Sequence, residues 1–255
     1  MVGEDHGQND GLGWVTETIA IWTQFPTRKG ILDLSGRLLK EIPSEVYRMR
    51  NLVSVRLSNN LLTEIPRDIE QLSQQPHTLT ELYLQENQIS KISRKIQELK
   101  SLETLVLSSN KLTSLPSAIG NLTSLTHLDV SYNTLTDISC FQTLCCLKVL
   151  NISHNQMANI PEFIPKIDSL RELDLSHNFI AFIPPSLNQL HKLRKLFLDH
   201  NVINKIPDEL GFMITADVIT IEGNPLSEER IIRKKGLYDR PKLLKYLRAR
   251  IRAQQ

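Results

Sequence analysis

The sequence has little cysteine and no long apolar run. Only Cys140, Cys145 and Cys146 occur among 255 residues, without a CxxC spacing. This scarcity argues against a disulfide framework or a structural zinc knuckle. No apolar run approaches ~18 residues, the length expected of a membrane-spanning helix. The first 30 residues are acidic and polar before any apolar stretch, the reverse of a secretory signal. We therefore expect a cytoplasmic protein in a reducing compartment.

Charge is nearly balanced over the whole chain but not along it. The net charge of +2 gives no general reason to expect nucleic acid or an acidic substrate. The stretch from Glu228 to Arg252, however, carries ten Lys or Arg residues against three acids. The C-terminal segment is therefore a local basic region.

A repeat of about 23 residues dominates the rest of the sequence. Successive units are spaced by 27, 23, 23, 22, 23, 23 and 23 residues when aligned on Leu52, Leu79, Leu102, Leu125, Leu147, Leu170, Leu193 and Ala216. Each unit follows LxxLxLxxNxL with occasional apolar substitutions. The asparagine position is filled in all eight units, by Asn60, Asn87, Asn110, Asn133, Asn155, Asn178, Asn201 and Asn224. A degenerate opening unit from Leu32 has Arg37 in its place.

This pattern resembles the leucine-rich repeat signature, which implies an α/β solenoid shaped like a horseshoe. We expect a parallel β-sheet on the concave face, short helical or 3₁₀ turns on the convex face, and helical caps at both ends. The predicted organisation is a disordered N-terminus over 1–12, a cap over 13–29, one degenerate and eight full repeats over 30–226, and a basic helical cap over 227–255. The alternation of side chains along a strand turns Leu173 and Leu175 into the core and Glu172, Asp174 and Ser176 toward the concave surface. The repeated asparagines should turn inward and satisfy buried backbone groups.

Two units depart from the norm in their return segments. Residues 73–77 accommodate a four-residue insertion, which should bulge from the convex side. The segment from Asp137 to Leu147 is one residue short and lacks the proline found in most return segments. Its cysteines should lie on the convex side. For the C-terminal cap, Asp239 is predicted to be the N-cap of a helix whose apolar stripe is Leu244, Leu247 and Ile251.

The return segments follow I/L-P-x-x-I/L-x-x-L, a form similar to that of Ras-binding leucine-rich repeat scaffolds, plant intracellular Ras-group proteins and the Scribble family. The resemblance implies a non-enzymatic adaptor in signal transduction, with a small GTPase or a phosphatase as its protein partner. It implies no catalytic residues and no cofactor. We expect a monomer.

The concave face is the expected binding surface, because its strand positions point outward between the buried leucines. The candidate partner-binding residues are Tyr83, His127, Asp129, Tyr132, Asn151, His154, Glu172, Asp174, His177, Phe197, Asp199 and His200. Acids would attract a basic partner, and aromatic side chains, Phe197 above all, would anchor it.

Serine, histidine and asparagine occur side by side in several units, as in Ser176, His177 and Asn178. Neighbouring imidazoles in such a column lie close enough to share a zinc ion, yet nothing requires one, and we expect no metal. A hydrolase would need free backbone N–H groups to form an oxyanion hole. In a parallel sheet these N–H groups already donate hydrogen bonds to the neighbouring strand. The alternative function is electrostatic binding of RNA or an acidic membrane surface by the basic tail, through Arg233, Lys234, Lys235, Lys242, Lys245 and Arg248.

Overall fold

The computed structural model describes residues 30–73, 79–227 and 240–254. The expected disorder over 1–12, the N-terminal cap over 13–29, most of the insertion after Ser73, and the N-cap role of Asp239 all lie outside the described residues. The same holds for Arg233, Lys234 and Lys235.

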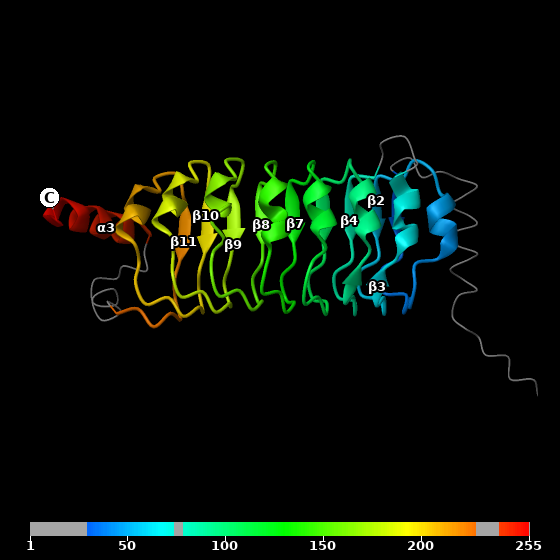
Figure 1. Ribbon diagram of the computed structural model, residues 1–255, viewed down its shortest axis with the longest axis horizontal. Helices are drawn as coiled ribbons and strands as arrows, with labels where there is room; N and C mark the ends of the chain where they lie inside the picture. Colours follow the sequence, from blue (N-terminus) through cyan, green and yellow to red (C-terminus); the bar gives the residue numbers. More distant parts are fainter. Residues whose placement is uncertain (1–29, 74–78, 228–239, 255) are drawn as a thin grey trace, which may run out of the picture.

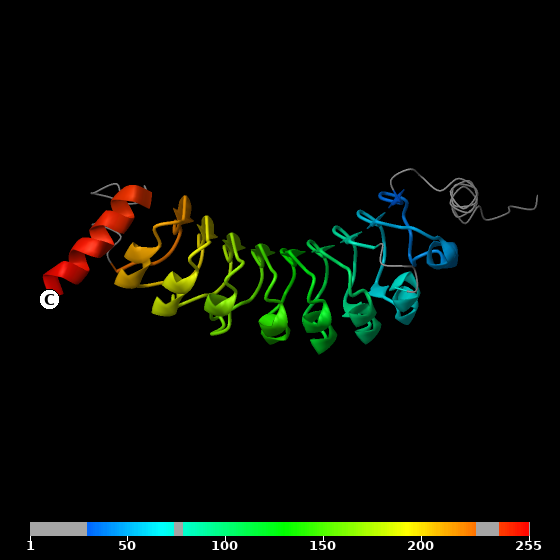
Figure 2. The same cartoon turned by 90° about the horizontal axis from the view of Figure 1, so that it is seen from above.

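Nine short parallel strands form one continuous sheet along the molecule. In spatial order they are β1 (Ile31–Asp33), β2 (Ser54–Arg56), β4 (Glu81–Tyr83), β6 (Thr104–Val106), β7 (His127–Asp129), β8 (Val149–Asn151), β9 (Glu172–Asp174), β10 (Lys195–Phe197) and β11 (Val218–Thr220). Figure 2 shows the sheet along the inner side of a shallow arc and the short helical turns along the outer side. The predicted repeat solenoid is confirmed.

The outer side consists of 3₁₀ turns, which suit the apolar spacing of the return segments. They are η1 (Ser44–Arg48), η2 (Arg67–Ser73), η3 (Arg94–Glu98), η4 (Ser117–Asn121), η5 (Ser139–Thr143), η6 (Ile164–Lys166), η7 (Pro185–Gln189) and η8 (Asp208–Phe212). A second parallel pair, β3 (Glu64–Ile65) and β5 (Lys91–Ile92), lies in the return segments that follow β2 and β4 (Figure 1).

The leucines of successive units stack into one core. Leu173 and Leu175 are fully buried, as are their equivalents in neighbouring units, while Glu172 and Asp174 keep partial exposure. Asn178 shows how the polar interior is satisfied: its Oδ1 accepts from Met157 N at 2.9 Å, and its Nδ2 donates to Ile152 O at 3.0 Å. The predicted inward position of the asparagines is therefore confirmed.

The short unit without proline still forms its turn, η5. Asp137 accepts hydrogen bonds from the backbone N–H and the hydroxyl of Ser139, at 3.0 and 2.6 Å, which fixes the entry to the turn. The backbone of this turn lies close to the preceding unit. A Cβ on Gly120 would lie 2.4 Å from the carbonyl oxygen of Cys140, so only glycine fits there.

The C-terminal end is covered by α3 (Arg240–Gln254), which packs on η8 (Figure 1). Leu244 and Leu247 are buried as predicted, and Leu243 joins them, whereas Ile251 stays partly exposed. A Cβ on Gly211 would lie 3.1 Å from Arg248 N, so a glycine in η8 permits this close approach.

Candidate functional site

Two columns of outward side chains run across the concave strands. Strand register places Glu81, Thr104, His127, Val149, Glu172, Lys195 and Val218 in one column. The second column contains Tyr83, Val106, Asp129, Asn151, Asp174, Phe197 and Thr220. The alternation predicted from the sequence therefore brings most candidate residues onto one surface. Tyr83 is the outlying candidate, because β6 separates β4 from β7.

A shallow hollow of about 240 Å³ lies on this surface across β6, β7, β8 and β9. It is lined by Thr104, Val106, His127, Leu128, Asp129, Val149, Leu150, Asn151, Glu172 and Asp174. Five of the candidate residues meet here, around apolar side chains. Sequence reasoning missed Val106 and Val149, although the same strand alternation places them in the two columns.

The carboxylates around the hollow have different partners. Glu172 pairs with Lys195, with 2.9 Å between Oε2 and Nζ. Asp129 and Asp174 each accept a hydrogen bond from the backbone N–H two residues later, at 2.9 Å from Ser131 and from Ser176. Neither forms an ion pair within the part of the chain that the structure describes. These two acids therefore both terminate a strand and present negative charge at the hollow.

A stack of aromatic rings borders the concave strands. The rings of Tyr132 and His154 have centroids 3.9 Å apart with 12° between their planes, and His154 and His177 repeat these values. His177 and His200 continue the stack at 4.4 Å and 20°. Burial, followed by the neighbouring His177, lowers the pKa of His154, while Asp174 opposes this effect.

The stacking bears on the zinc alternative. An imidazole nitrogen offers its lone pair in the plane of the ring. Because neighbouring rings lie face to face at 3.9 Å, an ion in the plane of one ring lies away from the plane of the next. Within residues 30–73, 79–227 and 240–254, no three His, Cys, Asp or Glu side chains come together as a metal site. The stack is built for contact between rings rather than shared ligation.

The repeated serine–histidine–asparagine triplet has local structural contacts. The hydroxyl of Ser176 donates to Asp174 Oδ1 at 2.7 Å, and the backbone N–H of His177 donates to Asp199 O at 2.8 Å. The His177 ring stacks on its neighbours. Ser176 and His177 thus do not form the nucleophile–base hydrogen bond that acyl transfer requires.

Phe197 and Asp199 lie at the C-terminal half of the surface. Phe197 stands between Asp174 and Thr220 as expected, but it is partly buried rather than fully exposed. Asp199 accepts hydrogen bonds from the Thr220 hydroxyl and from Glu222 N, the latter at 2.7 Å. Asp199 therefore joins the last two units, which the sequence did not indicate.

The basic cap is partly used in packing. Arg250 Nε lies 2.9 Å from Asp208 Oδ1, and both side chains are mostly buried. Arg248 packs over Gly211 and its Nε donates to Leu244 O at 3.2 Å. Of the cations proposed for polyanion binding, Lys242 and Lys245 are the exposed ones among the described residues.

Comparison with known proteins identifies the repeat. The family model described as "Leucine rich repeat" matches residues 77–135 and 147–203, and the model described as "Leucine Rich repeats (2 copies)" matches 123–165. The nine-stranded solenoid agrees with both matches. The chain is a leucine-rich repeat protein.

Solved leucine-rich repeat structures share the fold. A leucine-rich repeat protein of Leptospira interrogans is 27% identical with a TM-score of 0.66, over 83% of this chain and 58% of that one. The ectodomain of a plant membrane receptor kinase from Arabidopsis thaliana, in complex with CASPARIAN STRIP INTEGRITY FACTOR 2, is 29% identical with a TM-score of 0.61, over 72% and 26%. The plant peptide hormone receptor RGFR1, in complex with RGF2, is 33% identical with a TM-score of 0.63, over 72% and 30%.

This leucine-rich repeat chain spans less than two thirds of the length of each of those structures. No curated protein matches its sequence. Among the described residues, no helix combines the length and apolar character needed to cross a bilayer.

Proposed function

We propose that this leucine-rich repeat protein is a non-enzymatic scaffold that binds a protein partner across its concave strands, from His127 to Glu222. The hollow across β6 to β9 carries the proposal, because Asp129 and Asp174, which form no ion pair among the described residues, lie there around apolar side chains. Such a surface offers both charge attraction and apolar contact. Leucine-rich repeat proteins generally mediate protein–protein contacts, and the plant receptors compared above hold their ligands in complexes.

The partner should present basic side chains on an extended segment. Asp129 and Asp174 lie in one column with Asn151 between them, so two cations spaced along an extended segment can reach both. Phe197 and the stack from Tyr132 to His200 supply flat apolar contact beside them. A small GTPase or a phosphatase in cytoplasmic signalling is the partner class that the repeat form favours, by resemblance alone.

Affinity capture from cell lysate tests this function. The first variant combines Asp129→Asn and Asp174→Asn, which keeps the hydrogen-bond acceptor for Ser131 and Ser176 but removes the charge. The second is Phe197→Ala. We expect each to reduce capture of the main partner by about tenfold or more, as at interface hot spots, while circular dichroism stays unchanged.

Gln189→Ala on the convex side is the control and should leave capture unchanged, because Gln189 is exposed away from the strands. Normal capture by both concave variants would refute the proposed surface. Loss of capture on substitution of Lys242 and Lys245 by Glu instead would assign binding to the basic cap.

A further inference from the structure

The first two repeat units lack the additional backbone hydrogen bonds that join the second unit to the third on the convex side. Between the second and third units, Ser90 N donates to Thr63 O at 3.0 Å and Ser93 N to Ile65 O at 2.9 Å. Between the first and second units, Leu61 N donates to Leu39 O at 2.8 Å. Beyond that point, no backbone hydrogen bond joins residues 40–43 to 63–66, both of which are described segments. At this place the two units line a space on the convex side.

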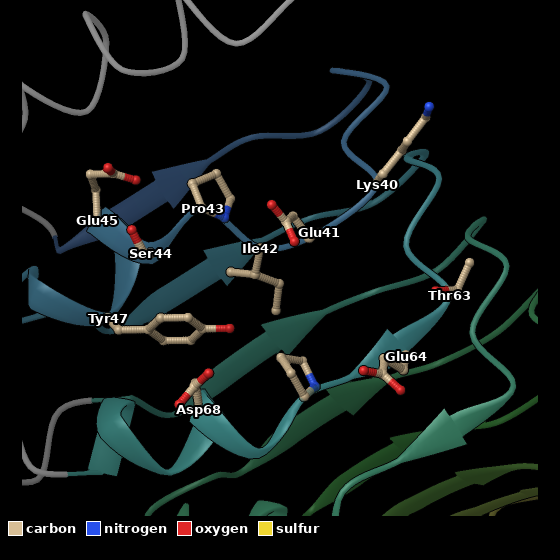
Figure 3. Close-up of a pocket in the computed structure, with 11 residues that line it drawn as sticks. Lys40, Glu41, Ile42, Pro43, Ser44, Glu45, Tyr47, Thr63, Glu64 and Asp68 are labelled. Atoms are coloured by element: carbon tan, nitrogen blue, oxygen red, sulfur yellow. The ribbon is translucent and has the colours of Figure 1, made fainter. Parts of the chain in front are cut away.

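A pocket of about 480 Å³ occupies this space. It is lined by Lys40, Glu41, Ile42, Pro43, Ser44, Glu45, Tyr47, Thr63, Glu64, Pro66 and Asp68. Figure 3 shows these side chains contributed by the segment that leads into η1, by η1 itself, and by β3 and the start of η2. The pocket is thus separate from the concave strands.

The charge of the lining is strongly acidic. The lining contains four carboxylates, those of Glu41, Glu45, Glu64 and Asp68, and one cationic side chain, that of Lys40. Asp68 accepts a hydrogen bond from Gln71 Nε2 at 3.1 Å. Within the described ranges, none of these four acids forms an ion pair. Because like charges gathered around one space repel each other, the pocket favours a cation.

Tyr47 supplies a second and independent sign of a ligand. Its side chain is 9% exposed, and its hydroxyl is buried without a hydrogen-bond partner among the described residues. Figure 3 shows this hydroxyl directed into the group of lining residues, between Ile42 and Asp68. Buried hydroxyl groups are nearly always paired, so one without a partner suggests a polar group that arrives from outside.

The protonation state of Tyr47 suits this role. Burial, then the negative charges of Asp68 and Glu41, raise the pKa of its hydroxyl. The group therefore stays neutral at physiological pH. A neutral hydroxyl oxygen still accepts a hydrogen bond from an N–H donor.

We propose that this pocket is a second binding site, which takes a lysine side chain from a basic peptide segment of a partner protein. The ammonium group donates one hydrogen bond to Tyr47 Oη and pairs with the surrounding carboxylates, of which Glu41 and Glu64 come from different units. The lysine stem is long and thin enough to pass the rim and pack against Ile42. Charge complementarity selects a basic occupant and disfavours an acidic one.

Titration with a fluorescent lysine-rich peptide tests the pocket. All measurements use the full chain with Asp129→Asn and Asp174→Asn, so that the concave surface does not dominate the signal. On this background we expect saturable binding that weakens about tenfold with Tyr47→Phe, since a hydrogen bond to a charged group is lost. Glu41→Gln with Glu64→Gln should weaken binding further and reduce its salt dependence.

Two controls separate the pocket from general effects. Tyr246→Phe removes a tyrosine hydroxyl on α3, at the other end of the solenoid, and should leave peptide affinity unchanged. Tyr47→Phe should not lower the melting temperature, because the hydroxyl forms no hydrogen bond within the described part of the chain.

Absence of peptide binding, or equal affinity of the Tyr47→Phe variant, would overturn the inference. A clear loss of melting temperature in Tyr47→Phe would do so as well, since it would show that the hydroxyl already has an internal partner. None of these outcomes bears on the function proposed for the concave face, which is tested by partner capture.

Discussion

At the scale of single residues, the position before each ladder asparagine has a special backbone. Tyr132, His154, His177 and His200 all have φ between 51° and 53°, in the left-handed region. Most side chains adopt this region only at some cost, although histidine and asparagine tolerate it better than average. Ring stacking offsets part of that cost. The column ends at Gly223, where a Cβ would lie 2.5 Å from His200 Nδ1.

Substitutions at His177 should expose this backbone requirement. His177→Val should lower the free energy of unfolding by about 1–3 kcal/mol more than His177→Asn, because a β-branched residue is strained at φ near 53°. Both variants lose the stacking contacts, so their difference isolates the backbone. Urea denaturation measures it, with His127→Val, on a strand, as the control. Equal stabilities of the two His177 variants would contradict the assignment.

The stack should also make stability depend on pH through His154. Burial and the neighbouring His177 lower the pKa of His154 from 6.5, so the unfolded chain takes up the proton first as the pH falls. Stability is therefore complete above this value and decreases below it, until the folded-state pKa is reached. Between pH 7.5 and 5.5, melting temperature should fall more in the parent than in His154→Asn, which has no titratable ring. A fall of equal size in both would show that His154 does not contribute.

These residue-scale features were only partly predictable. The sequence placed the histidines in one column, because the repeat period does so directly. It did not reveal the left-handed backbone or the face-to-face rings, since both depend on the turn that the inward asparagine imposes. The role of Asp199 could not be predicted either, because the hydrogen bond that it accepts from Glu222 N depends on how closely the last two units approach each other.

At the scale of elements, each unit depends on its neighbours for its buried contacts. A solenoid therefore needs closed ends, and α3 closes the C-terminal one by covering η8 with Leu243, Leu244 and Leu247. The buried pair of Arg250 and Asp208 fixes the orientation of this helix. The sequence predicted the helix and most of its apolar stripe. It missed Leu243, because the broader contact with η8 is a tertiary feature.

Removing one contact of the cap should be costly. Leu247→Ala should lower the free energy of unfolding by about 2–5 kcal/mol, since the side chain is almost fully buried against η8. Thermal melts followed by circular dichroism provide the measurement. Lys245→Ala, which changes an exposed position of the same helix, should have almost no effect. If the two variants melted alike, α3 would not be an essential cap.

At the scale of the whole molecule, periodicity carried most of the prediction. Regular spacing of leucine and asparagine was enough to indicate the solenoid, the parallel sheet and the two faces. The periodic spacing could not predict features that occur only once in the molecule. The pocket between the first two units is one such feature, and the Tyr47 hydroxyl, which has no hydrogen-bond partner among the described residues, is another. A periodic pattern contains no information about either.

Hydroxyl-radical footprinting of the captured complex tests the concave-face function most directly. With partner bound, we predict reduced oxidation of Tyr132, His177 and Phe197, because their side chains lie on or beside the concave strands. Phe212 on η8 should react as in the free protein, since it is exposed on the convex side. Unchanged oxidation of Tyr132 and Phe197, together with protection of Phe212 or Tyr246, would contradict the account and place the partner at the C-terminal cap.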